Sequence, residues 1–327
     1  MPAPILKDGD RLNKRFRVVG AKPIGQGQFA EVYRAMDERP GSGSGSGSGT
    51  GAGVRYVAVK IERKDQTSTR ERRALLELQG CKGVVNAIDS GTTNGRDNPF
   101  IVMDLVGDNL ADVRRDKLRH SGSGSGSGPG ARHSLRTVGW IGAQMLDILR
   151  GMHAKGYIHR DVKPSNVTLG GVSASADPDD TRRLYLIDLG LAKVFETARP
   201  TAGADAKPVA FRGSTTYTSI NVHAGEQHGP RDDLWSLLYM LAECHEGTLP
   251  WRSIKDRGRA HLHGPGSERE DDAESVKAEI HQSKLECVKH PERLCPTRGT
   301  PSALVEFSRS LERVRHGPDT PDYDGLR

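Results

Sequence analysis

The chain has 327 residues, of which 35% are hydrophobic and 5% aromatic, and its net charge of +6 comes from 48 Lys and Arg against 42 Asp and Glu. This mildly basic composition, without a basic face interleaved with aromatic residues, disfavours a protein built for duplex DNA; an anionic small molecule or an acidic peptide is the favoured partner, and nucleic acid the weaker alternative. No run of about 18 apolar residues occurs, which excludes a membrane-spanning helix.

Four cysteines stand far apart in the chain, at Cys81, Cys244, Cys287 and Cys295. No two of them form a CxxC pair, so their spacing fits neither a zinc site nor a disulfide framework. Cys287 and Cys295 with His290 lack a fourth ligand at a regular spacing, and we do not interpret them as a metal site. The first residues, "MPAPILKDGDRLNKRFRVV", contain no apolar signal core. We therefore expect a reducing intracellular compartment, cytoplasmic or nuclear.

Two Ser-Gly runs interrupt the chain, at residues 41–49 and 121–128. Their composition is typical of flexible coils in surface loops, and they are either native expansions or engineered linkers. Before the first run, residues 15–37 have the pattern of a strand, a glycine turn and a second strand; after it, residues 54–63 alternate like a third strand. Because doubling the length of a loop costs only about 0.6 kcal/mol, the first run does not prevent these strands from pairing.

A helix and another strand are expected next. Residues 70–79 favour a short helix, and residues 98–107 favour a strand that runs into a connection. Beyond the second Ser-Gly run, apolar residues at steps of three and four predict a helix with one buried stripe. The stripe consists of Val138, Ile141, Met145, Ile148 and Met152.

The remaining sequence changes from short strands to helices. Short apolar runs at residues 166–170 and 183–190 predict two small strands with a variable insertion between them. The later sequence is helical in pattern, most clearly at residues 232–244 and 301–314. The layout is therefore α+β, with a small sheet-rich half followed by a larger helical half.

The first candidate functional residues lie in the sheet-rich half. Gly25 and Gly27 occupy the predicted strand–turn–strand, where the lack of side chains lets backbone N–H groups approach phosphate oxygens, although most such glycine pairs are ordinary hairpin turns. Lys60 ends "VAVK" in a predicted strand, and a lone lysine there is usually a solvated edge charge. Glu71, on the following predicted helix, can pair with Lys60, and that pair is one part of a phosphoryl-transfer site.

The segment "HRDVKPSN" (159–166) is too polar for a strand or a buried helix, and its proline disfavours helical geometry at the preceding residue. We expect an ordered loop with the parts that phosphoryl transfer requires. Asp161 would accept the proton of an attacking hydroxyl, and Lys163 would meet the transferring phosphate. Asn166, together with Asp188 of the later "DLG", would hold Mg²⁺. Chance does not account for these residues occurring in this order.

The chain resembles eukaryotic protein kinases, and among them the casein kinase 1 group and its tau-tubulin kinases. The motifs that carry the resemblance are "HRDVKPSN", "DLGLAK", "FRGSTTYTSINVH", "DDLWSLLYMLAE" and "LPWRSIKD". In that group "SIN" (219–221) replaces the "APE" of other kinases. The resemblance runs from about residue 14 to the end, apart from the Ser-Gly runs and an insertion at 258–272. It implies a bilobal fold, with a small β-sheet N-lobe carrying one regulatory helix (14–106) and a larger helical C-lobe (107–327).

The resemblance also implies a binding site for ATP. Met103 would guard the back of the adenine pocket, and Asp104 and Val106 would offer backbone hydrogen bonds to the adenine edge. Asp233 would brace the catalytic loop. The other residues implied around the nucleotide are Ile24, Gly25, Gln26, Gly27, Val32, Ala58 and Lys60.

Four positions depart from the family pattern. Ala30 replaces the third glycine of the nucleotide loop, and Leu189 replaces the Phe of "DFG" but keeps an apolar anchor, so we expect activity to survive both changes. Thr216 stands where the group commonly has an arginine that helps bind an anion beside the substrate, which leaves Arg212 and Lys255 as the basic residues there. The last residues, "PDYDGLR", resemble the start of a final helix that the family continues, which predicts an incomplete C-terminal lobe.

Two classes of function remain. An active kinase accounts for every polar motif residue, whereas a pseudokinase scaffold that binds nucleotide and partner proteins usually lacks one of Lys60, Asp161, Asn166 or Asp188. The resemblance implies protein substrates with Ser or Thr, because Lys163 follows the base by two places as in serine/threonine kinases. A monomer is favoured. Arg160 pairs with a phosphorylated activation loop in many kinases, but kinases resembling casein kinase 1 generally need no such phosphate.

Overall fold

The computed structural model describes residues 4–27, 30–39, 54–63, 68–93, 98–120, 131–171, 182–195, 213–262, 269–314 and 321–327. The predictions for the Ser-Gly runs, for Arg212 and for most of the insertion after residue 170 lie outside these residues. The chain forms two compact units. One contains Met1–Asn109 and Val167–Gly190, and the other contains Leu110–Asn166 and Leu191–Arg327.

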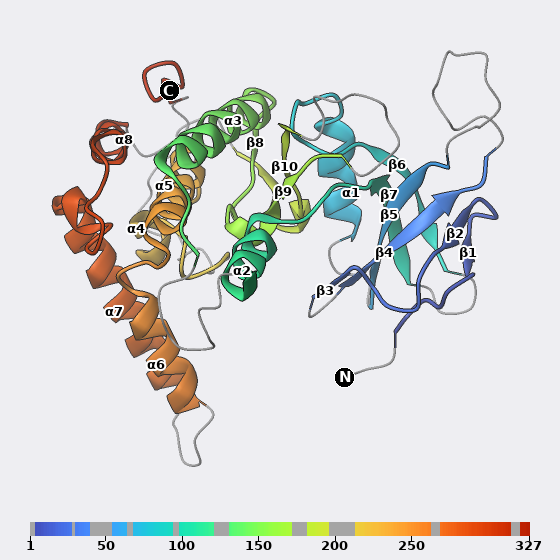
Figure 1. The fold of residues 1–327 in the computed structure, drawn as a ribbon, viewed down its shortest axis with the longest axis horizontal. Helices are drawn as coiled ribbons and strands as arrows, with labels where there is room; N and C mark the ends of the chain where they lie inside the picture. Colours follow the sequence, from blue (N-terminus) through green and yellow to red (C-terminus); the bar gives the residue numbers. More distant parts are fainter. Residues whose placement is uncertain are drawn as a thin grey trace, which may run out of the picture. The chain divides into compact units, whose positions relative to one another are not determined.

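The first unit is built on an antiparallel seven-stranded sheet with the order β1-β2-β4-β5-β7-β6, in which β3 also pairs with β4 (Figure 1). The strands are β1 (Arg11–Leu12), β2 (Phe16–Val18), β3 (Gly25–Gln26), β4 (Ala30–Asp37), β5 (Tyr56–Glu62), β6 (Ala87–Thr92) and β7 (Pro99–Asp104). Helix α1 (Ser68–Glu77) packs on β6 and β7. A two-stranded ribbon of β9 (Val167–Leu169) and β10 (Leu184–Leu186) completes this unit.

Successive side chains of β5 point to opposite faces of the sheet. Val57, Val59 and Ile61 are buried in the apolar core of the sheet, and each such side chain contributes about 1.5–3 kcal/mol on burial. Ala58 and Lys60 alternate with them and point to the opposite face. The core cluster consists of Leu6, Leu12, Phe16, Val18, Tyr33, Ala35, Val57, Val59, Ile61, Phe100 and Val102.

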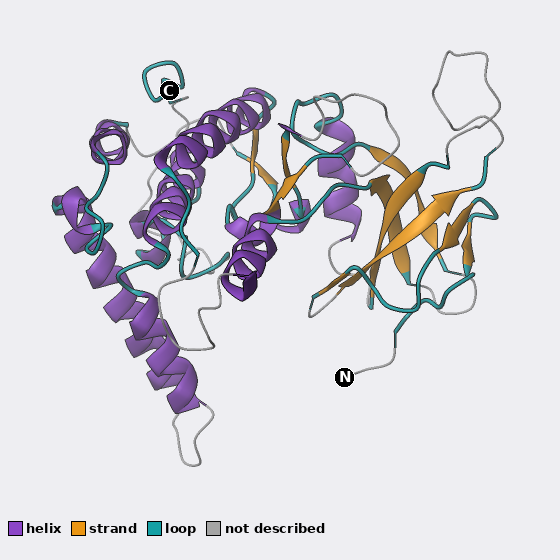
Figure 2. Cartoon of the chain, viewed as in Figure 1, coloured by secondary structure: helices purple, strands orange, loops and turns teal. Residues whose placement is uncertain are grey.

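The second unit is mainly helical (Figure 2). Its elements are α2 (Leu110–His120), α3 (Leu135–Ala154), β8 (Tyr157–Ile158), η1 (Pro164–Asn166), β11 (Lys193–Val194), α4 (Ile220–His223), α5 (Pro230–Glu246), α6 (Arg252–Leu262), α7 (Arg269–Lys289), η4 (Pro291–Arg293) and α8 (Ser302–Arg313). Helix α5 packs against both α3 and α8, and α7 packs against α4 and α6. Nearly every residue of α5 is buried, which makes it the central helix of the unit.

Helix α3 shows why its sequence forms this element. The Ser134 hydroxyl caps its first turn by accepting the Thr137 N–H at 3.2 Å. The predicted apolar stripe, from Val138 to Met152, is buried at all five positions. Steps of three and four keep these side chains on one face, and that face packs against α5.

The structure confirms the α+β class and the predicted strands and helices up to α8. The expectation that residues 321–327 start a final helix is wrong, because they form turns. Elements that the patterns did not single out include β6, whose sequence contains Ser90 and Gly91, and the charged helix α2. Neither has a clear apolar period. In the described part of the chain, none of the helices combines the length and hydropathy that a membrane crossing requires.

All four cysteines carry free thiols. Cys81, in the first unit, is half-buried, whereas the other three lie buried in the second unit. Burial raises the pKa of Cys244 to about 12, of Cys287 to about 11 and of Cys295 to about 12. These three thiols are therefore protonated at neutral pH.

Candidate functional site

Lys60, Glu71 and Asp188 form an ion-pair cluster within the first unit, which we call the Lys60 centre. The Lys60 Nζ lies 2.7 Å from Glu71 Oε2 and 2.8 Å from Asp188 Oδ1. The Glu71 side chain is 2% exposed and that of Lys60 is 16% exposed, whereas that of Asp188 is 45% exposed. The predicted pair of Lys60 with Glu71 therefore forms, and a second, more accessible carboxylate joins it.

The electrostatics of the Lys60 centre keep its lysine charged. Burial alone lowers the pKa of Lys60, but the carboxylates of Glu71 and Asp188 outweigh burial and raise this pKa above its ordinary value. Burial raises the pKa of Glu71, and the Lys60 ammonium opposes that shift. A fixed cation beside an accessible carboxylate suits the binding of a phosphate and its metal ion.

The backbone at Asp188 is held in an uncommon conformation. Asp188 has a φ of 66°, in the left-handed region that a non-glycine residue rarely adopts. A Cβ atom at Gly190 would lie 3.4 Å from Asp188 Oδ1 and 3.8 Å from Glu71 Oε2, so glycine leaves these carboxylates room. Leu189, which lies between Asp188 and Gly190 in the sequence, is buried, as expected for the apolar anchor that replaces Phe. Such local strain is found where a side chain must take one functional direction.

The sheet register brings most of the expected nucleotide residues together. Gly25 pairs with Val32, Val32 pairs with Lys60, and Ala58 pairs with Met103 on neighbouring strands. Ile24 donates its N–H to the Val32 carbonyl at 2.8 Å and is itself exposed. Gln26 ends β3, and the Gly27 N–H bonds the Ala30 carbonyl at 2.8 Å. Ala30 is the half-buried first residue of β4 and accepts this hydrogen bond with its methyl group in place.

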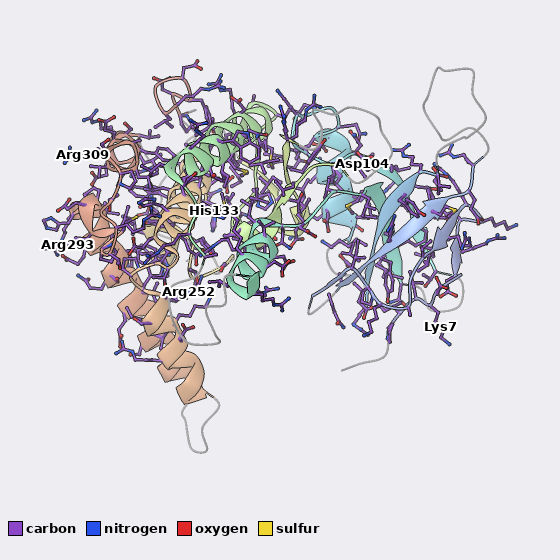
Figure 3. All side chains as sticks on the ribbon, viewed as in Figure 1. Lys7, Asp104, His133, Arg252, Arg293 and Arg309 are labelled. Atoms are coloured by element: carbon purple, nitrogen blue, oxygen red, sulfur yellow. The ribbon has the colours of Figure 1, made fainter. Side chains whose placement is uncertain are left out.

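Strand β7 ends at Asp104, which is labelled in Figure 3, and the residues expected at the adenine edge lie at and just beyond this end. Met103 is buried. Asp104 donates its N–H to the Asn86 carbonyl at 3.2 Å, and its carboxylate accepts from the Asn86 side chain at 2.8 Å and from Arg55 at 3.2 Å. The Asp104 N–H is therefore already bonded to a neighbouring backbone carbonyl. Val106 follows in the connection and is half-buried.

The second unit contains the loop at residues 159–166 that the sequence predicts to be the catalytic loop. The Asp161 Oδ2 accepts from Lys163 Nζ at 2.5 Å and from Asn166 Nδ2 at 3.1 Å. Its Oδ1 accepts from the Ser214 N–H at 3.1 Å. Asn166 also donates to the Asp161 carbonyl at 2.9 Å. The carboxylate is thus oriented by two side chains and by one backbone N–H that sequence reasoning did not identify.

A hydrogen-bonded chain of three buried side chains, Asp233, His153 and Tyr323, supports this loop, and we call it the Asp233 relay. The Asp233 carboxylate accepts the N–H groups of His159 and Arg160 at 2.7 and 2.8 Å, as the resemblance implied. His153 Nε2 contacts Asp233 Oδ2 at 2.9 Å, and the Tyr323 hydroxyl contacts His153 Nδ1. These hydrogen bonds hold the pKa of Asp233 below its usual range despite its burial. Tyr323, from the last described segment, is a member of the relay that the sequence did not reveal.

Thr216 is more constrained than its sequence position suggested. It is 1% exposed, its Oγ1 accepts from Lys255 Nζ at 2.8 Å, and its carbonyl accepts from Trp251 Nε1 at 2.8 Å. Lys255 is therefore bonded to the hydroxyl that replaces the family's arginine. The "SIN" motif is also anchored, because the buried Ser219 caps α4 and donates to Asp232 Oδ1 at 2.6 Å.

The donors needed for Mg²⁺ are oxygen atoms on both candidate ligands. The Asn166 nitrogen is committed to Asp161, which leaves the amide oxygen as the donor suited to a hard cation. Asp188 offers a carboxylate that is 45% exposed. Asn166 and Asp188 belong to different units. Across the described residues, no cluster of three or more His, Cys, Asp or Glu side chains has the arrangement of a metal site.

Comparison with known sequences identifies the family. The sequence profile of the protein kinase domain matches residues 19–289. The chain therefore belongs to the protein kinase family, and its α+β architecture is that of the bilobal kinase fold.

Three relatives refine the comparison. A Dictyostelium discoideum protein named as a serine/threonine-protein kinase is 36% identical over 76% of this chain and 44% of its own length. A Caenorhabditis elegans protein named as a casein kinase I is 29% identical over 81% of this chain and 72% of its own length. A casein kinase 1-like protein of Oryza sativa subsp. japonica is 32% identical over 74% of this chain and 32% of its own length. The chain thus spans less than half of the Dictyostelium and rice relatives.

Proposed function

We propose that this protein is an ATP-dependent serine/threonine protein kinase that transfers the γ-phosphate of Mg-ATP to protein hydroxyls. The observation that carries the proposal is the Lys60 centre, in which a lysine that remains charged is held by one buried and one accessible carboxylate. The catalytic loop of the second unit supplies the complementary group, because the Asp161 carboxylate is oriented by Lys163, Asn166 and Ser214.

The residues of the first unit act on the nucleotide in this proposal. Lys60 binds the phosphates, and Glu71 keeps its ammonium in place. The backbone around Gly25 and Gly27 approaches the phosphate oxygens, while Met103 and the Asp104 carbonyl recognise adenine. Little covalent chemistry is asked of these groups, since positioning and charge stabilisation provide most of the catalysis of phosphoryl transfer.

The residues of the second unit act on the acceptor in this proposal. Asp161 orients the substrate hydroxyl and accepts its proton, and Lys163 meets the transferring phosphate. Asn166 and Asp188 would hold Mg²⁺, which when bound supplies charge neutralisation on the phosphates. Ser or Thr is the acceptor we propose, because Lys163 follows Asp161 by two residues, as in serine/threonine kinases. Protein substrates and a monomeric state remain parts of this proposal.

The casein kinase 1 group, and within it the tau-tubulin kinases, is the subgroup we propose. Two relatives carry casein kinase 1 names. The "SIN" motif supports the subgroup through a specific contact, since Ser219 bonds Asp232 at the start of α5. We propose the kinase over the pseudokinase because Lys60, Asp161, Asn166 and Asp188 are all present.

The decisive experiment incubates the protein with labelled ATP, magnesium and a mixed panel of serine, threonine and tyrosine peptides. We expect magnesium-dependent labelling of serine and threonine. Phosphotyrosine as the main product would overturn the proposed residue class. Binding of ATP without transfer to any peptide or to a general acceptor such as casein would favour the pseudokinase instead.

A further inference from the structure

Lys284 of α7 is a fully buried lysine of the second unit that the proposed mechanism does not use. Its side chain has an exposed fraction of 0%. The Nζ donates to the Thr215 carbonyl at 2.8 Å and to the Thr218 carbonyl, and it lies 3.2 Å from His223 Nε2. These partners are backbone oxygens and an imidazole rather than carboxylates.

The two carbonyls bound by Lys284 belong to a compact turn that we call the 213–218 turn. Within it, the N–H groups of Tyr217 and Thr218 donate to the Ser214 carbonyl at 2.9 and 3.0 Å, and the Thr218 hydroxyl donates to the same oxygen at 2.9 Å. Trp251 Nε1 binds the Thr216 carbonyl at 2.8 Å. Side chains from outside the turn therefore hold three of its carbonyl groups in place.

The 213–218 turn is joined directly to the catalytic loop. The Ser214 N–H donates to Asp161 Oδ1 at 3.1 Å. Gly213 has a φ of 103°, and a Cβ atom there would lie 2.6 Å from the Arg160 carbonyl oxygen. The turn thus packs so closely on the loop that only glycine fits, and a shift of the turn would change the hydrogen bond to Asp161.

A lysine suits this position in either protonation state. An ammonium has three N–H donors and a neutral amine has two, so both forms can bond the two carbonyls. The Nζ also lies 5.1 Å from the ring centroid of Tyr239 and 5.2 Å from that of Trp251, where aromatic faces offset the loss of water around a cation. Burial lowers the pKa of His223 to about 3, so its imidazole is neutral. Its Nε2 faces both the Lys284 amine and the Thr215 carbonyl, at 3.2 and 3.3 Å, and the tautomer decides whether Nε2 donates or accepts. A residue needed only to fill space here would have no reason to be polar.

We propose that Lys284 is a positioning residue of the kinase reaction: by holding the 213–218 turn it keeps the Ser214 N–H on Asp161 and thereby orients the catalytic base. This inference rests on the proposed function, because it gives Asp161 the role of base. Lys284 contacts neither substrate nor nucleotide in it, and acts through the turn alone.

The test compares Lys284→Met with Lys289→Met. Methionine keeps the length of the side chain and removes its donors, and Lys289 lies on the same helix but is 65% exposed. We expect Lys284→Met to lower kcat about 10- to 100-fold, because small misplacements of catalytic groups are costly, and to leave the KM for ATP within about twofold. Lys289→Met should match wild type in both. Rates are normalised to the folded fraction, measured by thermal unfolding.

Hydrogen exchange of the amides of residues 213–218 gives a second readout that needs no activity. We expect these amides to exchange faster in Lys284→Met while those of α3 keep their protection. A variant that unfolds more easily but keeps wild-type kcat per folded molecule would overturn the inference, as would unchanged exchange in the turn. If Lys284→Met does not fold, Trp251→Phe removes the indole N–H that binds the Thr216 carbonyl and keeps an aromatic ring near Lys284 and Tyr239. This variant must then lower kcat per folded molecule at least about threefold for the inference to stand. A wild type without phosphoryl transfer would refute the proposed function itself and, with it, this role.

Discussion

Lys60, whose side chain is 16% exposed, and Lys284, which is fully buried, lie one in each unit and meet opposite surroundings. Two carboxylates contact Lys60 and raise its pKa, despite its burial. Lys284 bonds two carbonyls and an imidazole, and burial together with the charge of Lys255 lowers its pKa well below the ordinary value. The partners, rather than the depth of burial, decide whether such a lysine keeps its charge.

The difference teaches what each lysine can do. A lysine that stays charged over the whole physiological range can bind phosphate as a point charge. A lysine that bonds carbonyls serves as a multiple hydrogen-bond donor and fixes backbone geometry. The same residue type therefore provides electrostatics in the first unit and positioning in the second.

The largest expected effect comes from breaking the Lys60 centre. Lys60→Met removes the cation and Asp188→Asn removes a charge that would hold the metal, and either change should lower kcat at least about 1,000-fold, equivalent to about 4 kcal/mol of barrier. The measurement is transfer from labelled ATP at saturating magnesium, with circular dichroism to confirm folding. Lys82→Met, at an exposed position of the same unit, is the control. Equal turnover by wild type and Asp188→Asn would contradict the kinase proposal.

The pH dependence of stability sharpens the contrast between the two lysines. Because the folded pKa of Lys284 lies below its unfolded value of about 10.5, the unfolded chain binds more protons between the two values. The stability contribution of Lys284 is therefore present above the unfolded pKa and is lost as the pH falls toward the folded pKa, by at most about 1.4 kcal/mol per pH unit. The raised pKa of Lys60 gives a contribution that stays constant up to pH 10.

Urea unfolding at pH 7, 8, 9 and 10 measures this contrast. The free energy of unfolding of wild type minus that of Lys284→Met should increase with pH, while the difference between wild type and Lys289→Met should stay flat. A constant difference for Lys284→Met would show that its carbonyl partners keep Lys284 charged and would remove the contrast with Lys60.

A smaller effect should follow from removing one hydrogen bond of the Asp233 relay. Tyr323→Phe removes the hydroxyl that contacts His153 and keeps the ring, so we expect a loss of about 1 kcal/mol in unfolding free energy and no more than a few-fold loss in kcat. The control is Arg327→Ala, because the Arg327–Asp147 pair is exposed at 3.4 Å and should contribute almost nothing. A loss of several kcal/mol on Tyr323→Phe would mean that the C-terminal segment depends on this one contact.

The smallest expected effect concerns Lys255. Its Nζ bonds the Thr216 hydroxyl, whereas Lys60 contacts carboxylates and Lys284 bonds carbonyls. Since Lys255 is engaged by Thr216, we expect wild type to favour a phosphoserine-primed peptide over its unprimed twin by no more than about threefold. Thr216→Arg adds a planar cation able to bind phosphate through two hydrogen bonds, and it should increase that ratio. A strong preference in wild type that the arginine does not increase would refute this interpretation.

The surroundings of Lys60 and of Asp161 could largely be predicted from the sequence. The apolar alternation around Lys60 predicted its strand, and the register of the structure pairs Lys60 with Val32 and Ile101 and pairs Ala58 with Met103. The loop around Asp161 followed from its polarity and its proline. These signals are local, which is why a pattern could find them.

The burial of Lys284 and the contacts of Ser214 and Tyr323 could not be predicted from the sequence. Lys284 lies in a helix with mixed composition, and nothing within it distinguishes a fully buried lysine from a solvated one. Ser214 acts through a backbone N–H, which carries no residue-type signal, and Tyr323 meets His153 across 170 residues of chain. Contacts of this kind depend on tertiary packing, so only the structure reveals them.

The reactivity of the four cysteines can be used to measure how often the folded chain opens. A thiol-alkylating reagent at neutral pH should modify Cys81 in the folded protein, whereas Cys244, Cys287 and Cys295 are shielded by burial and by their raised pKa. Because Cys81 reacts in the folded state, mass spectrometry of its labelled peptide gives an internal reference for the reagent, and the peptides of the other three cysteines follow the second unit without an introduced probe. The labelling rate of the three buried thiols would then report how often the helical unit opens.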